Sequence, residues 1–170
     1  MEEINNQNLS GEEALAKIRE ITADAKTCFF CTDIRTGVPM SVRPMNILQV
    51  DDSGYFWFMT AEYTRKDDEV LENPFVHVLV QRESGHGFLN IYGIAEPQDN
   101  PEKAKELWRP ELDVWFDGPE DPQIVLIRVE VLDGHYWDNK SSAPVAAFKS
   151  LKALITGKRE DNGVQGDIEI

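Results

Sequence analysis

The chain contains, near its middle, the stretch Tyr55-Phe-Trp-Phe-Met-Thr60-Ala-Glu-Tyr-Thr64-Arg65-Lys66. Its first half is typical of a hydrophobic strand, and the acidic residues 67–72 after it are typical of a short helix. Hydroxyls and cations thus precede a helix start, where backbone N–H groups and the helix dipole favour an anion. Arg43, on the preceding predicted strand, could reach the same point. The stretch predicts a phosphate site; the alternative is that Arg65 and Lys66 are an ordinary solvated helix start.

The composition indicates one compact domain and argues against polyanionic partners. With 170 residues, 41% of them hydrophobic, the chain is long enough for a substantial core. The 17 basic and 31 acidic residues give a net charge of −14, which repels nucleic acid and anionic membrane surfaces. The first residues lack the pattern of a secretory signal, and no apolar stretch approaches the roughly 20 residues that span a bilayer. We therefore expect a soluble, cytoplasmic protein that binds neither nucleic acid nor membranes.

Short apolar segments separated by tight turns dominate the chain. Val76, Val78 and Val80, for example, form one face of a strand, and Ser10 with Glu13 forms a capping box that opens a helix. Strands are predicted at 27–34, 38–50, 55–60, 75–81, 88–97 and 124–137, helices at 10–25, 100–108 and 142–158, and a polar tail at 159–170. Hairpins rather than βαβ units connect the strands, so the sequence predicts a mainly β fold: one domain, 1–170, built as an antiparallel barrel with peripheral α-helices.

Both cysteines lie in Cys28-Phe-Phe-Cys31, which matches the spacing of a redox or metal-binding motif. The flanking residues are typical of a strand, where positions three apart point to opposite faces. The two thiols are therefore predicted to be structural. The three histidines are scattered, so no metal site is predicted; His77, which alternates with apolar residues, is expected to be an interior or interface residue.

These residues carry a resemblance to a known family. Thr60, Thr64, Arg65 and Lys66 resemble the Thr-x-x-x-Ser/Thr-Arg-Lys signature of the pyridoxamine 5′-phosphate oxidase-like, FMN-binding split-barrel proteins. The order of further motifs resembles the general stress protein branch of that family over roughly residues 10–160. Those motifs are Arg43-Pro44-Met45, Asn73-Pro74, Gly93-x-Ala95-Glu96, Tyr136-Trp137-Asp138 and Thr156-Gly157-Lys158.

The resemblance implies a homodimer of six-stranded antiparallel split β-barrels that holds FMN at the subunit interface. It also implies the residues of the cofactor site, carried over position by position. Arg43, Thr64, Arg65 and Lys66 would hold the phosphate. Pro44, Met45 and the backbone of Phe58, Met59 and Thr60 would lie beside the flavin ring, and Trp108, Trp115 or Trp137 of the partner chain would close the site.

The sequence is compatible with two main functions. One is an FMN-dependent oxidoreductase of unidentified substrate, with NAD(P)H as a candidate electron donor; its catalytic residues are unknown. The other is a flavin-binding stress protein that stores or senses the cofactor without turnover. A third reading keeps the barrel but replaces FMN by haem, by another flavin-like cofactor or by none. Vitamin B6 oxidation is not expected, because the chain ends in residues 163–170, without the Arg- and Trp-containing segment of the true oxidases.

Overall fold

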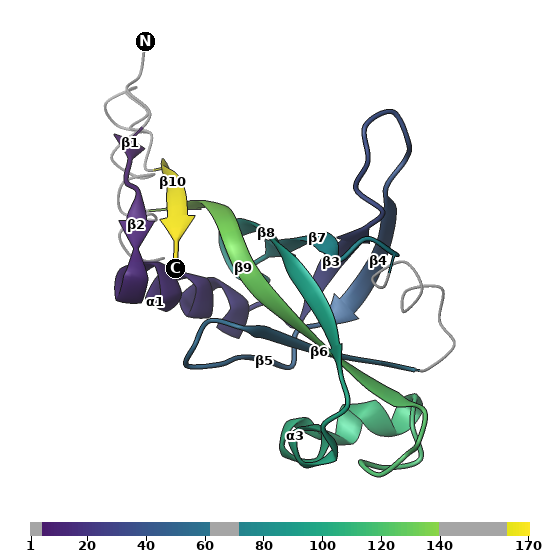
Figure 1. Cartoon of the computed structure of the whole chain (residues 1–170). Helices are drawn as coiled ribbons and strands as arrows, with labels where there is room; N and C mark the ends of the chain where they lie inside the picture. The colour runs from purple at the N-terminus through teal and green to yellow at the C-terminus, as the bar shows by residue number, and fades with distance from the viewer. Residues whose placement is uncertain (1–4, 62–71, 140–162) are drawn as a thin grey trace.

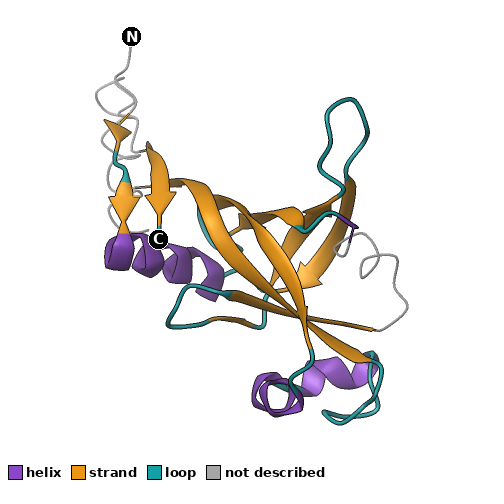
Figure 2. Ribbon diagram, viewed as in Figure 1, coloured by secondary structure: helices purple, strands orange, loops and turns teal. Residues whose placement is uncertain are grey.

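The computed structural model describes residues 5–61, 72–139 and 163–170, and six of its strands form the predicted barrel (Figures 1 and 2). They are hydrogen-bonded in the order β4-β3-β7-β8-β9-β6, and every neighbouring pair is antiparallel. Within the described ranges no ladder joins β4 to β6, so the barrel is split along that seam. The predicted split-barrel fold class is confirmed. The six strands are β3 (Thr27–Thr32), β4 (Ser41–Asn46), β6 (Phe56–Ala61), β7 (Phe75–Gln81), β8 (Phe88–Gln98) and β9 (Ile124–Asn139).

The barrel is filled by the side chains that alternate inward along these strands. Phe30 and Phe58 meet edge to face at the centre, with ring centroids 5.0 Å apart. Helix α1 (Gly11–Ala23) buries Ile18 and Ile21, three positions apart on one helix face, against this core. Ser10 is its N-cap residue, but the hydroxyl makes no cap hydrogen bond within the described part, so the predicted capping box does not form.

Ion pairs fasten α1 to the sheet. The Lys17 ammonium lies 2.7 Å from a Glu20 oxygen and 3.0 Å from a carboxylate oxygen of Asp138, whose side chain is buried. The Arg82 guanidinium, at the end of β7, lies 3.0 Å from Glu20. Burial raises the pKa of Glu20, but hydrogen bonds from Lys17 and Arg82 outweigh it and bring the pKa below its ordinary 4.5.

Strand β9 is long because both of its halves have partners. One edge of β9 pairs with β8. The other edge pairs with β6 in the first half of the strand and with β10 (Gly163–Glu169) in the second. A bulge after Tyr92 shifts the β8–β9 register at Gly93. A Cβ at Gly93 would lie 2.2 Å from the Glu130 carbonyl oxygen, so the bulge requires glycine.

The existence of β10 contradicts the predicted polar tail at 159–170. Val164 and Ile168 of this strand are buried, and two short N-terminal strands run parallel to it, β1 (Asn5–Asn6) and β2 (Leu9–Ser10). The prediction was wrong because only two apolar residues mark the strand, whose stability depends on the exposed edge of β9. The helix predicted at 142–158 lies outside the described residues.

A second, smaller hydrophobic cluster packs on the Trp57 side of β6, away from the barrel core. Helix α3 (Pro101–Leu107) begins at the predicted proline, with the Asn100 side chain accepting a hydrogen bond from the Lys103 amide at 3.0 Å. The 3-10 helix η1 (Pro110–Val114) follows it. Both pack on Trp57, which is buried beside the short strand β5 (Gln49–Val50). No helix in the described ranges combines the length and apolar character needed to cross a membrane.

Candidate functional site

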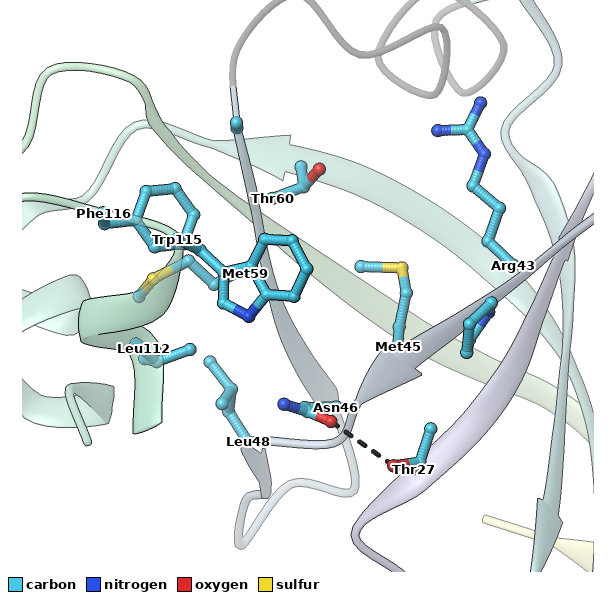
Figure 3. A pocket seen from close by; sticks show the side chains of 12 residues that line it. Thr27, Arg43, Met45, Asn46, Leu48, Met59, Thr60, Leu112, Trp115 and Phe116 are labelled. Atoms are coloured by element: carbon cyan, nitrogen blue, oxygen red, sulfur yellow. Dashed lines mark hydrogen bonds between the residues drawn. The ribbon is translucent and has the colours of Figure 1, made fainter. Parts of the chain in front are cut away.

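A cavity of about 490 Å³ opens at the seam between β4 and β6 (Figure 3). The missing ladder leaves a gap there, into which both strands direct side chains. One wall comes from β3, β4 and the residues after β4, the opposite wall from β6, and a cover from η1 and the residues after it. The lining residues are Thr27, Arg43, Pro44, Met45, Asn46, Leu48, Met59, Thr60, Ala61, Leu112, Trp115 and Phe116.

Strand β4 positions two of the predicted site residues on one face. Arg43 is opposite Phe30, and Met45 is opposite Cys28, and both partners belong to the core. Residues paired across neighbouring strands lie on the same face of a sheet. Arg43 and Met45 therefore lie on the inner face, at the side where the barrel is open, and both are partly buried. The alternation of side chains along β4 thus places these two residues together.

Strand β6 leaves the core as it reaches the cavity. Phe56, Trp57 and Phe58 are buried, whereas the next three residues, 59–61, are only partly buried and line the cavity. The side chain of Phe58 points into the barrel centre and is absent from the described lining, which agrees with the expectation that only its backbone approaches a ligand. Thr60 thus faces Arg43 and Met45 across the seam, whereas the Met59 side chain points the other way, toward Leu112 (Figure 3).

The cover over the cavity is built by a segment for which the sequence predicts no element. Leu112 and Phe116 are buried beneath it, and an Arg109 guanidinium nitrogen donates to the Leu48 carbonyl oxygen. Trp115 lies between these anchors with 72% of its surface exposed, yet it lines the cavity of its own chain. Leu112, Phe116 and Leu48 were not predicted as site residues; the i, i+4 spacing of Leu112 and Phe116 was the available signal.

The remaining predicted site residues divide into two groups. Thr64, Arg65 and Lys66 lie outside the described residues. Trp108 packs on Phe116, with ring centroids 6.3 Å apart, and does not line the cavity. Trp137 lies on the far half of β9, its ring centroid 4.4 Å from that of His135. The prediction that Trp108 or Trp137 of a partner chain closes the site stays a prediction.

The charge of the cavity differs from that of the whole protein. Among the described lining residues Arg43 is the one charged side chain, and no carboxylate accompanies it. The opposite end is apolar and is formed by Leu48, Leu112 and Phe116. The Arg43 cation beside the apolar side chains of Pro44 and Met45 suits a ligand that joins an anionic group to a planar ring. No three His, Cys, Asp or Glu side chains gather as a metal site anywhere in the described ranges.

Comparison with known proteins identifies relatives of the chain. A family model described as pyridoxamine 5′-phosphate oxidase like matches residues 13–161. General stress protein 26 of Bacillus subtilis (strain 168) is 29% identical over 90 residues, 51% of this chain. The chain spans less than two thirds of the curated relatives it matches, 64% of that protein and 65% of protein bli-3 from Neurospora crassa.

Solved structures share the fold. A protein from Jannaschia sp. CCS1, provisionally assigned as general stress protein 26, has a TM-score of 0.77 and 23% identity, covering 91% of this chain and 97% of its own. A general stress FMN/FAD binding protein from Xanthomonas citri has a TM-score of 0.62 and 23% identity, covering 75% and 91%. At 23% sequence identity, the similarity to these two structures supports a shared fold and nothing beyond it.

Proposed function

Since the chain belongs to the pyridoxamine 5′-phosphate oxidase-like family, we propose that the seam cavity binds a flavin, with FMN as the cofactor and oxidation or reduction of a small molecule as the activity. The observation that carries the proposal is the placement of Arg43 and Met45 on one face, opposite Thr60. The Xanthomonas citri protein, which has the same fold, is an FMN/FAD binding protein. A cytoplasmic location is part of the proposal.

The residues present fit such a cofactor. The Arg43 guanidinium would hold the phosphate through charge-assisted hydrogen bonds, together with Thr64, Arg65 and Lys66 as the sequence predicts. Pro44, Met45 and the backbone of residues 58–60 would lie against the ring. When bound, flavin supplies hydride transfer, so the protein contributes binding, orientation and exclusion of water.

A holder without turnover is the second candidate function, and one observation favours it. The described lining contains no His, Asp, Glu, Lys, Cys or Tyr, so the polar side chains at hand besides Arg43 are Thr27, Asn46 and Thr60. None of these three is an effective general acid or base at neutral pH. Bleaching of the bound flavin by NADH or NADPH would support an oxidoreductase, and resistance to both would support the holder.

A homodimer is the assembly that we propose. The outer face of the barrel sheet, defined by Phe29, Phe75, Phe88 and Trp137, exposes four large aromatic side chains on neighbouring strands. His77 also lies on this face, with Nδ1 2.8 Å from the Asn90 side-chain oxygen. Several large apolar side chains exposed on one face are typical of protein interfaces, and a two-fold axis pairs such a face with itself.

The dimer is tested by light scattering coupled to size-exclusion chromatography. Phe29 is 57% exposed, so Phe29→Glu would leave the monomer folded while placing a charge in the proposed interface. We expect wild type to elute as a dimer and the variant as a monomer. A wild-type monomer, or a variant that remains dimeric, would refute this face as the interface.

The cofactor assignment is tested by spectroscopy of the purified protein. We expect flavin absorbance, or quenching of FMN fluorescence on titration. Arg43→Ala should weaken FMN about 10- to 100-fold, because a charge-assisted hydrogen bond is worth about 1.5–3 kcal/mol. Arg35→Ala is the matched control: Arg35 is exposed and pairs with Asp33, away from the cavity. Unchanged affinity in the Arg43→Ala, Lys66→Ala double variant would rule out the phosphate site.

A further inference from the structure

The cavity has two chemically different ends. Arg43 lies at one end, and Leu48, Leu112 and Phe116 form the other. Figure 3 shows the Trp115 indole over the cavity, on the side away from Arg43. If a flavin phosphate occupies the Arg43 end, the apolar end is the part of the same cavity in which a second molecule can meet the ring.

Trp115 is held in this position by a well-anchored backbone. Its amide donates to the Leu112 carbonyl oxygen at 2.9 Å, and the Phe116 amide donates to the same oxygen at 3.1 Å. The buried side chains of Leu112 and Phe116 fix the segment on both sides. An indole that is 72% exposed on such a fixed backbone presents an apolar face to a ligand at little entropic cost.

The apolar end also excludes charged ligands. Within the described lining no carboxylate can pair with a cationic substrate, and the one cation lies at the other end. Burying a charged group without a partner is strongly unfavourable. Asn46 can make one polar contact with a ligand. Its Oδ1 accepts a hydrogen bond from Thr27 Oγ1 at 3.4 Å, so its amide NH₂ remains as a donor for a carbonyl or hydroxyl oxygen of the ligand.

We infer that the end of the cavity under Trp115 binds an uncharged, planar aromatic molecule that carries a hydroxyl or carbonyl oxygen, and that this is the substrate class of the site. The inference rests on the proposed function, because it assigns the Arg43 end to the cofactor. Trp115 is then a specificity-determining residue that stacks on the substrate, and Asn46 orients it.

The test uses 2-naphthol as the neutral probe and 2-naphthoate as its anionic counterpart, with binding measured by isothermal titration calorimetry in the presence of saturating FMN. We expect 2-naphthol to bind at least tenfold more tightly than 2-naphthoate. Trp115→Ala should weaken 2-naphthol about tenfold, in line with the worth of an aromatic contact and its buried area. Trp115→Phe, which keeps an aromatic face, should recover most of that loss.

Val114→Ala is the matched control, because Val114 is the exposed neighbour of Trp115 and does not line the cavity. Equal affinity of wild type and Trp115→Ala would overturn the inference, as would tighter binding of 2-naphthoate. If saturating FMN abolishes 2-naphthol binding, the apolar end holds the flavin ring and the inference fails while the cofactor proposal stands. If the protein binds no flavin, but 2-naphthol binds and depends on Trp115, the proposed function fails and the aromatic site stands.

Discussion

Replacement of Gly166 by alanine should break the contact between the two ends of the described chain. A Cβ at this position would lie 2.0 Å from the Gln7 carbonyl oxygen, whereas ordinary contact begins at 3.4 Å. The Gln7 oxygen must therefore move by about 1.4 Å, or β10 must move away from it. The clash involves backbone atoms on both sides, so no side-chain rotation can relieve it.

The cost follows from the hydrogen bonds that hold Gln7. Its amide donates to the Gln165 carbonyl oxygen at 2.7 Å, and its carbonyl oxygen accepts from the Tyr136 hydroxyl at 2.7 Å. A shift of the required size exceeds the range of either bond. Tyr136 is buried, so its hydroxyl would be left without a partner, which costs about 1–3 kcal/mol, and the backbone bond adds about 1 kcal/mol. We expect Gly166→Ala to lower the free energy of unfolding by about 2–4 kcal/mol.

Urea unfolding followed by far-UV circular dichroism measures this loss, and a double-mutant cycle with Tyr136→Phe assigns its origin. Because the phenylalanine has no hydroxyl to leave unsatisfied, Gly166→Ala should cost at least 1 kcal/mol less in the Tyr136→Phe background. If Gly166→Ala unfolds within about 0.5 kcal/mol of wild type, the typical scatter for a surface change, the close approach of Gln7 is wrong. A full cost in both backgrounds would instead exclude the Tyr136 bond as its source.

Three further predictions concern the described part of the chain. Asp51→Ala should destabilise the protein by about 2–3 kcal/mol, measured by urea unfolding. The Asp51 carboxylate accepts hydrogen bonds from the backbone amides of residues 53 and 55 and, at 2.7 Å, from Trp57 Nε1, and the variant loses all three. Asp52→Ala is the control. Since the pKa of Glu20 is lowered by folding, stability should fall as the pH drops below 4.5, and less steeply in Glu20→Gln. Cys28 and Cys31 are buried, so both thiols should react with Ellman's reagent rapidly only after unfolding; rapid reaction of the native protein would contradict this.

The barrel was predictable because its strands are marked by period-two patterns that need no tertiary information. Val76, Val78 and Val80 point inward as the pattern requires. Strand β10 has two apolar residues, Val164 and Ile168, and gains its stability from pairing with the second half of β9. A strand that is stabilised mainly by pairing with a neighbouring strand cannot be recognised from its own residues.

The part of the candidate site on β4 was predictable for the same reason, the alternation of side chains along a strand. Alternation along one strand was enough to place Arg43 and Met45 together. The cover of the cavity depends on how η1 packs across the sheet, so the part played by Leu112 and Phe116 could not be read from spacing alone. Trp115 was named as one of three tryptophans that close the site from a partner chain, whereas the structure places it in the cavity of its own chain.

The pairing of β1 and β2 with β10 has a consequence for how the protein is made. Residues 5–10 are synthesised before every strand of the barrel, but the strand that they pair with, 163–169, is synthesised after all of them. At about 5–20 residues per second, the N-terminal segment waits on the order of ten seconds or more for its partner. The short strands β1 and β2 therefore have no edge to pair with while the barrel strands are being made, and they join the sheet only after β10 has been synthesised.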